Sequence, residues 1–235
     1  MIKLLIILPT YNERDNIRSL IPSINKILNR AVSHTILVID DNSPDETARV
    51  ADELAQMYPV ELISRPGKMG LGSAYALGFD YAVKNGYSHA MTMDADCSHD
   101  PIHITELIKF ADNYDLVIGS RYIPGGKILN WPFHRKILSS GANFLVKNLL
   151  TKTIADNTSG YRLYKVSSLK EINYKLQNDG YAYLFEMALL FNKNMLKIKE
   201  TPIVFVERRS GASKVSRREI LKALRTLFRL SINKK

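Results

Sequence analysis

Two carboxylates one residue apart end an apolar stretch of this chain: Asp94 and Asp96 in the segment TMDADCSHDP, residues 92–101. Acidic residues are poor strand formers and like charges repel, so the pair calls for a cation nearby. Asp-x-Asp spacing lets a loop direct both side chains at one hard divalent cation, with water and diphosphate oxygens as its other ligands. The structural alternative is that Asp94 caps the strand turn and Asp96 starts the next helix, because Asp is common in turns.

The glycine-rich segments do not match the common phosphate-binding loops. The segment GKMGLGSAY (67–75) contains neither G-x-G-x-x-G nor G-x-x-x-x-G-K-[ST], and GSRYIPGGKI (119–128) also lacks the second motif. These patterns argue against a dinucleotide-dependent dehydrogenase and against a P-loop NTPase.

The composition of the 235 residues is that of a globular protein with an anionic partner. Lys and Arg number 33 against 23 acidic residues, a net charge of +10, which fits nucleic acid, an anionic membrane surface or a phosphorylated substrate. The single cysteine, Cys97, excludes an internal disulfide and fits a reducing, cytoplasmic compartment. The apolar run at the N-terminus predicts a buried strand, and we expect no signal peptide and no transmembrane helix.

Apolar runs alternate with helical patterns over the first 120 residues. We expect strands at 4–10, 34–40, 60–65, 89–95 and 115–121, with helices at 13–28, 45–58, 72–86 and 102–112 between them. Ser43 and Pro44 are expected to cap and open the second helix. This alternation predicts an α/β fold with a mainly parallel central sheet, covered on both faces, whose ligands bind beyond the carboxyl ends of the strands.

Several motifs follow one another along nearly the whole chain, from Pro9 to Lys214: LPTYNE, ILVIDDNSPDET, MTMDADCSHDP, GSRY, SGYR and ERRSGASK. This ordered set closely resembles the inverting glycosyltransferase family 2. Within that family it is most similar to polyprenol-phosphate glycosyltransferases of the dolichol-phosphate mannose synthase type. The resemblance implies a GT-A, Rossmann-like nucleotide-diphospho-sugar transferase fold over residues 1–215. Residues 1–122 would form the nucleotide-sugar half and 123–215 the acceptor half, followed by a basic amphipathic helix at 216–235.

The resemblance also implies roles for individual residues. Asp94 and Asp96 would hold Mg²⁺ or Mn²⁺ against the donor diphosphate, with Ser98 as a possible third ligand where some relatives have Gln. Asp96 and Arg121 are the catalytic candidates. The expected donor-binding residues are Pro9, Tyr11, Glu13, Asp41, Lys68, Asp94, Ala95, Asp96 and Arg121. The residues expected to bind an acceptor phosphate are Arg135, Ser139, Arg208 and Lys214.

The charge balance of the second half helps to choose the acceptor. Its motifs contain several cations and few acids: Arg121, Arg135, Arg162, Arg208, Arg209 and Lys214. A phosphate monoester, with a second pKa of about 6, is already largely ionised at neutral pH and needs cations to position it rather than a base to activate it. If a base is required, Asp96 is the nearest candidate.

The predicted reaction is transfer of a hexosyl group, mannose from GDP-mannose, with inversion onto a polyprenyl (dolichyl-type) monophosphate. Two enzyme alternatives stay open: the same reaction with UDP-glucose, and a saccharide hydroxyl as acceptor. An alternative from another class is a basic nucleic-acid-binding protein, against which the acidic strand ends argue because they would repel a phosphate backbone.

The last expected helix has an apolar face, with Ile220, Leu221, Leu224, Leu227 and Phe228, and a basic opposite face. This pattern fits an interfacial membrane helix, and equally a terminal helix packed on its own domain. A lipid acceptor favours the membrane, giving a peripheral protein on the cytoplasmic face that contacts the bilayer or a membrane-embedded subunit. Asp40 is expected to brace the loop after the second strand. The histidines His99, His103 and His134 are expected to be surface or loop residues.

Overall fold

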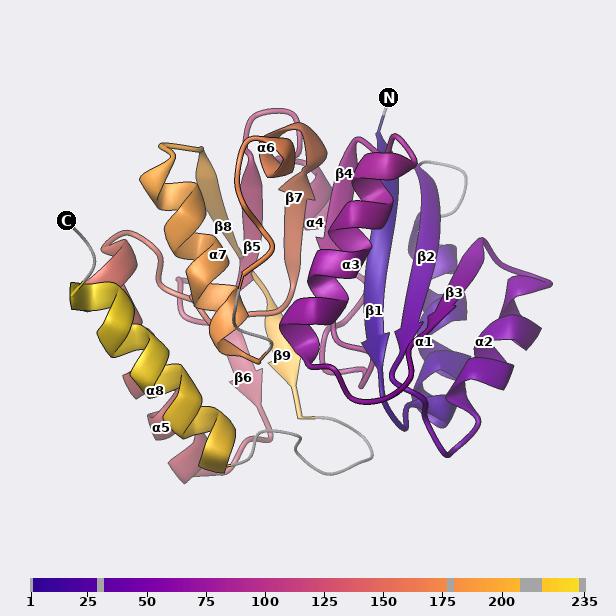
Figure 1. The fold of residues 1–235 in the computed structure, drawn as a ribbon, viewed down its shortest axis with the longest axis horizontal. Helices are drawn as coiled ribbons and strands as arrows, with labels where there is room; N and C mark the ends of the chain where they lie inside the picture. The colour runs from indigo at the N-terminus through magenta and orange to yellow at the C-terminus, as the bar shows by residue number, and fades with distance from the viewer. Residues whose placement is uncertain (1, 29–31, 177–179, 208–216, 233–235) are drawn as a thin grey trace.

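The computed structural model describes residues 2–28, 32–176, 180–207 and 217–232. Its centre is a seven-stranded sheet in the order β3-β2-β1-β4-β7-β5-β8 (Figure 1). The strands are β1 (Lys3–Thr10), β2 (Ser33–Asp40), β3 (Val60–Ser64), β4 (His89–Thr92), β5 (Leu116–Ser120), β7 (Arg162–Lys165) and β8 (Ile198–Pro202). A second, two-stranded sheet joins β6 (Lys127–Leu129) to β9 (Val204–Val206).

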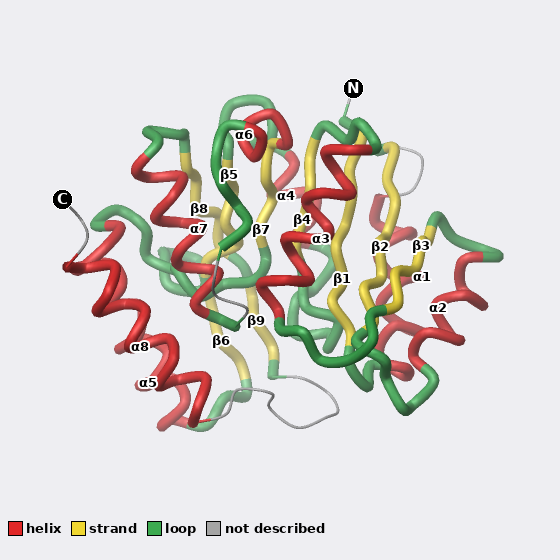
Figure 2. The backbone as a smooth tube through the Cα atoms, in the orientation of Figure 1, coloured by secondary structure: helices red, strands yellow, loops and turns green. Residues whose placement is uncertain are grey.

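Helices cover both faces of the large sheet (Figures 1 and 2). They are α1 (Arg14–Leu28), α2 (Thr47–Ala55), α3 (Leu71–Lys84), α4 (His103–Ile108), α5 (Phe133–Val146), α6 (Val166–Lys170), α7 (Ala182–Lys193) and α8 (Arg217–Ile232), and a π-helical turn at Lys147–Thr151 continues α5. Alternate residues of β1 show why two layers form. Leu4 and Ile6 pack into the core under α1, whereas Leu5 and Ile7 pack into the core under α3. A strand buried on both faces reads as a continuous apolar run, so the fold prediction is confirmed.

The strand β7 is the exception to the parallel arrangement. It runs antiparallel between β4 and β5, with Arg162 opposite Thr92 on one side and Ile118 on the other. The start of β7 therefore lies at the same edge as the carboxyl ends of β4 and β5. Residues 156–160, which precede β7, are brought to that edge although they are distant in sequence.

One local prediction is wrong: Ser43 does not cap the second helix. Its hydroxyl donates to Asp40 at 2.5 Å, and α2 begins only at Thr47. Asp40 also accepts hydrogen bonds from the backbone N–H of Ser43 at 2.9 Å and from the hydroxyl of Thr10 at 2.9 Å. The expected brace at Asp40 is confirmed, and it occupies the hydroxyl that would have capped the helix.

No helix in the described ranges combines the length and the apolar character that crossing a membrane requires.

Candidate active site

The acidic pair lies directly beyond the carboxyl end of β4. The Asp94 side chain is about one-third exposed, at 35%, whereas Asp96 is buried. Asp96 accepts two hydrogen bonds through Oδ1, from the backbone N–H of Ser98 at 3.1 Å and from the Ser98 hydroxyl at 2.5 Å. Cys97 adopts a positive φ of 61° within this turn. Ser98 thus supports Asp96, and its predicted role as a metal ligand stays a prediction.

The His99 side chain is buried next to the acidic pair, so the prediction that it lies on the surface is wrong. The ring is 2% exposed, stacks on Tyr161 with centroids 4.8 Å apart, and meets the edge of Phe205. Its Nδ1 accepts the backbone N–H of Asp94 at 3.0 Å. Burial lowers the pKa of His99, although Asp94 and Asp96 act in the opposite direction. A neutral ring with an unprotonated Nδ1 is therefore the form that fixes the Asp94 backbone.

Gly160 lies against the Asp94 carboxylate without a side chain of its own. A Cβ at this position would lie 3.2 Å from Asp94 Oδ1 and 3.3 Å from the hydroxyl oxygen of Tyr75. Tyr75 is fully buried, and its hydroxyl has no hydrogen-bond partner among the described residues. Burial raises the pKa of Tyr75 well above its ordinary value and the Asp94 carboxylate adds to the rise, so the hydroxyl stays a donor beside the acidic pair.

Arg121 stands at the end of β5 and is held by Asp156. Its Nε and Nη2 donate to the two Asp156 oxygens at 2.7 and 2.8 Å, and Nη2 also donates to Thr158 at 2.8 Å. Asp156 is itself fixed, because its backbone N–H donates to Glu200 at 2.9 Å. Burial disfavours the charge of Arg121, but Asp156 and, more weakly, Asp94 outweigh it and raise the pKa of the guanidinium. Asp94, Asp96, His99, Arg121 and Asp156 thus form one electrostatic cluster.

Several other predicted donor residues lie on the loops after β1, β2 and β3. Asp41 is buried and pairs with Arg65 at 2.5 Å. Lys68 lies over the ring of Tyr11, with Nζ 3.7 Å from the centroid. Glu13 accepts the Asn16 amide at 2.6 Å. Pro9 is half-buried within the last residues of β1, and Ala95 is buried between the two acids.

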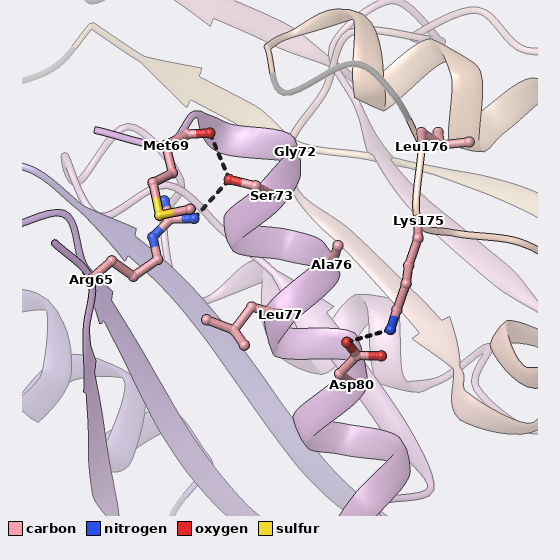
Figure 3. Close-up of a pocket in the computed structure, with 9 residues that line it drawn as sticks. All are labelled: Arg65, Met69, Gly72, Ser73, Ala76, Leu77, Asp80, Lys175 and Leu176. Atoms are coloured by element: carbon pink, nitrogen blue, oxygen red, sulfur yellow. Dashed lines mark hydrogen bonds and ion pairs between the residues drawn. The ribbon is translucent and has the colours of Figure 1, made fainter. Parts of the chain in front are cut away.

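A pocket of about 330 Å³ adjoins this loop region on the outer side of α3 (Figure 3). Arg65 lines it, donating to Ser73 at 2.7 Å and to the Gly70 carbonyl at 3.2 Å, while Lys175 pairs with Asp80 at 2.9 Å at its other end. The acidic pair does not line it. The pocket is therefore separate from the Asp94–Arg121 cluster, and Arg65 links its wall to Asp41.

The predicted acceptor residues begin on α5. Arg135 donates twice through Nη1 to the Glu207 carboxylate, at 2.7 and 2.9 Å, and lies over the ring of Trp131. Ser139 follows one turn later and is partly exposed. The remaining two, Arg208 and Lys214, lie outside the described residues.

The donor set of the cluster fits a hard divalent cation with few protein ligands. In the part of the chain that the structure describes, no group of three or more His, Cys, Asp or Glu side chains could hold a metal ion. Asp94 and Asp96 would supply two carboxylates. Water and diphosphate oxygens would complete a coordination shell of the kind Mg²⁺ prefers.

Sequence reasoning missed Asp156, Tyr75 and the burial of His99. A signal existed for Asp156, since it comes shortly before the SGYR motif and so just ahead of β7. Nothing in the local pattern of Tyr75 or His99 distinguishes them from ordinary core or loop residues.

A mostly parallel sheet covered on both faces, with an Asp-x-Asp at the end of a central strand, is the GT-A architecture of nucleotide-sugar transferases. The family model "Glycosyl transferase family 2" matches residues 5–173. The chain belongs to this family of glycosyltransferases.

Two curated relatives are similar over nearly the whole chain. Polyprenol monophosphomannose synthase of Mycolicibacterium smegmatis is 41% identical over 224 residues, 94% of this chain and 83% of the relative. Undecaprenyl-phosphate mannosyltransferase of Micrococcus luteus is 38% identical over 216 residues, 91% of this chain and 88% of the relative.

Two solved structures share the fold at low sequence identity. Glucosyl-3-phosphoglycerate synthase of Mycobacterium tuberculosis, in complex with Mn²⁺, UDP-glucose and phosphoglyceric acid, has a TM-score of 0.69 and 17% identity, over 96% of this chain and 80% of that one. The mannosyltransferase PcManGT of Pyrobaculum calidifontis, in complex with GDP-Man and Mn²⁺, has a TM-score of 0.64 and 17% identity, over 98% and 64%.

Proposed function

We propose that this chain transfers a mannosyl group from GDP-mannose, with inversion, onto a polyprenyl monophosphate, and that the reaction needs a divalent cation. The relatives' names support mannose and the polyprenyl phosphate. The observation that carries the proposal is the placement of the Asp94–Asp96 pair beside a buried Arg121 that Asp156 holds in a fixed orientation.

The partners of the carboxylates favour a phosphate acceptor over a hydroxyl acceptor. Asp96 accepts two hydrogen bonds from Ser98, Asp156 is bound to Arg121, and Glu207 is bound to Arg135. A hydroxyl acceptor requires a carboxylate base placed to remove its proton, whereas Asp156 and Glu207 are bound to arginines and Asp96 is proposed to bind the metal ion. A phosphate monoester carries its nucleophilic charge already, so these carboxylates are available to orient cations instead.

On the donor side, Asp94 and Asp96 would hold Mg²⁺ or Mn²⁺, which would neutralise charge on the leaving diphosphate. The neutral His99 ring fixes the Asp94 backbone, and Ser98 fixes the Asp96 carboxylate. Asp41 is proposed to face the nucleotide base from the loop that Arg65 braces. A Mn²⁺ complex with a nucleotide sugar in each of two proteins of this fold supports the cation.

On the acceptor side, Arg135 and Ser139 are proposed to bind the lipid phosphate, while Arg121 is proposed to bind the donor. Arg135 and Ser139 lie one turn apart on α5. The predicted contributions of Arg208 and Lys214 concern residues outside the described ranges. A lipid acceptor also places the reaction at a membrane surface, and the cytoplasmic face remains our prediction.

The test uses purified protein with Mn²⁺ or Mg²⁺, a short-chain polyprenyl phosphate and a panel of labelled nucleotide sugars. We expect label to enter the lipid phase from GDP-mannose, and to be lost with chelator, with Asp96→Ala and with Arg121→Ala. Transfer from UDP-glucose instead would refute GDP-mannose as the donor and leave the proposed mechanism in place. Binding of a nucleotide sugar with no lipid product would overturn the acceptor.

A further inference from the structure

Exposed apolar side chains gather on two helices at one end of the molecule, α5 and α8 (Figure 1). Ten of the fifteen large apolar side chains that are exposed among the described residues belong to α5, to the π-helical turn after it, or to α8. They are Phe133, Ile137, Leu138, Phe144, Leu145, Leu149, Leu221, Leu224, Phe228 and Ile232. Apolar surface concentrated in this way marks an interaction site.

The helix α5 is apolar on two opposite sides. Val146 is buried near its end, and Leu150 is buried in the following turn, against α7 and α8. On the opposite side of α5 lie Phe133, Ile137 and Phe144, which are 77%, 55% and 67% exposed. Because the protein covers only one of these two apolar sides, the other remains open to a partner or to lipid.

The packing of α8 bears on the two alternatives that its sequence left open. It packs on its own domain through Leu227, which joins Val146, Leu150 and Phe185 in one apolar cluster. A separate stripe remains uncovered, spaced by three, four and four residues: Leu221, Leu224, Phe228 and Ile232. The packed side agrees with a terminal helix on its own domain, and the interfacial role of the uncovered stripe stays a prediction.

Basic residues predominate on the two helices that carry this apolar surface. Residues 133–152 and 220–232 contain seven Lys or Arg and no Asp or Glu. Arg135 and Arg229 are paired to acids elsewhere, while Lys147 and Arg225 are exposed. In a two-fold dimer the same patch would face itself, bringing like charges together. An anionic lipid surface satisfies both the apolar side chains and the cations.

We propose that the α5–α8 surface, defined by the ten exposed residues above, docks on an anionic bilayer. This inference rests on the proposed function, because α5 also carries Arg135 and Ser139. A helix lying in the interface places its apolar side at the boundary between headgroups and acyl chains. The acceptor phosphate of a polyprenyl lipid, whose chain lies in the bilayer, is then presented at the level of these two residues.

The experiment measures co-sedimentation with phosphatidylcholine vesicles, with and without phosphatidylglycerol. We expect binding to the anionic vesicles that weakens as salt rises. The double variant Phe144→Gln/Phe228→Gln should bind at least about tenfold more weakly, because two aromatic side chains no longer leave water. The matched control Met57→Gln/Ile102→Gln changes two exposed apolar residues elsewhere, 69% and 57% exposed, and should bind as the unchanged protein does.

Activity separates this inference from the proposed function. With a short acceptor dispersed in detergent, Phe144→Gln/Phe228→Gln should keep its rate, whereas with an acceptor embedded in vesicles the rate should fall with binding. Vesicle binding without mannosyl transfer to any acceptor would refute the proposed function and leave the docking surface in place. Absence of vesicle binding would overturn the docking surface. So would a loss of self-association in the double variant with unchanged vesicle binding, which would assign the surface to a second copy.

Discussion

Arg121 and Asp156 form a buried, two-pronged ion pair that connects the end of β5 to the segment before β7. Asp156 also accepts the backbone N–H of Arg121 at 3.0 Å, so the carboxylate holds both the main chain and the side chain. The guanidinium lies near the rings of Tyr122, Trp131 and Phe205, at 5.3 to 5.7 Å from their centroids. Arg121 is therefore a cation of fixed direction rather than a mobile surface charge.

We expect Asp156→Asn to destabilise the fold. The change removes the charge that compensates a buried guanidinium, and breaking such a pair from one side costs about 3 kcal/mol of unfolding free energy. Urea unfolding at neutral pH measures it. The control is Glu53→Gln, which removes an exposed partner of Arg18 and Arg49 and should cost no more than about 1 kcal/mol. Equal losses in both variants would contradict a special role for the buried pair.

The loss of stability caused by Asp156→Asn should depend on pH. Burial alone would raise the pKa of Asp156, but Arg121 outweighs it and the pKa is lowered. A carboxylate with a lowered folded pKa contributes stability that is present above its unfolded pKa and is lost as pH falls through the folded value. The stability difference between the unchanged protein and Asp156→Asn should be constant from about pH 5 to 8 and shrink below about pH 4. A constant difference down to acid unfolding would argue against this linkage.

Gly160→Ala should weaken donor binding while the chain still folds. The new methyl group would press on Asp94 Oδ1 and the Tyr75 hydroxyl, at 3.2 and 3.3 Å, and turn the carboxylate away from the cation. We expect Mn²⁺-dependent GDP affinity, measured by calorimetry, to fall about tenfold. Gly141→Ala is the control, because nothing lies within 4 Å of a Cβ there. Unchanged affinity in Gly160→Ala would show that Asp94 has room to adjust.

The variant Ser98→Ala tests whether Ser98 only positions Asp96 or binds the metal ion itself. Loss of the hydroxyl removes a hydrogen bond to a charged acceptor at 2.5 Å, while the backbone N–H of Ser98 still donates to Asp96. We expect Mn²⁺-dependent GDP binding to weaken about tenfold. Asp96→Asn, measured in parallel, should abolish that binding. If Ser98→Ala abolished it as well, Ser98 would be a ligand in its own right.

Glu207→Gln should strengthen acceptor binding. Glu207 is half-buried and neutralises Arg135, the predicted ligand of the lipid phosphate. Removing its charge should lower the KM for polyprenyl phosphate about fivefold, since pairs of this exposure contribute about 1 kcal/mol, and leave the KM for GDP-mannose unchanged. Glu106→Gln, which breaks the exposed pair with Lys109, is the control. A raised acceptor KM would mean that Glu207 holds Arg135 in its working position.

The sequence allowed the alternating half of the fold to be predicted because its signals are local. Apolar runs and helical periods between Lys3 and Ser120 correspond to β1 through β5 and the helices between them. The same holds for the acidic turn, where Asp94 and Asp96 follow an apolar run. The position of β7 was not predictable in this way, since its two neighbours in the sheet are chosen by long-range packing.

The missed site residues share this cause. His99 is buried because Tyr161 and Phe205 cover it, and both come from segments far later in the chain. The period of α8 predicted its amphipathic character. It did not predict that Leu227 alone among its five expected apolar residues would be buried, because that choice depends on Val146, Leu150 and Phe185. Ser43 was mistaken for a cap because its hydroxyl donates to the nearby Asp40 carboxylate instead of binding the start of the helix.

The antiparallel β7 also sets an order of events during synthesis. β4 and β5 do not pair with each other, because β7 lies between them and supplies the hydrogen bonds of both. A nascent chain that has emerged only through β5 therefore has two strands with exposed edges and an Arg121 without Asp156. Long-range pairings of this kind form slowly and leave edges open to aggregation in the meantime. We expect the edge of the sheet that carries Asp94, Asp96 and Arg121 to assemble as a late step of folding, after Lys165 has left the ribosome.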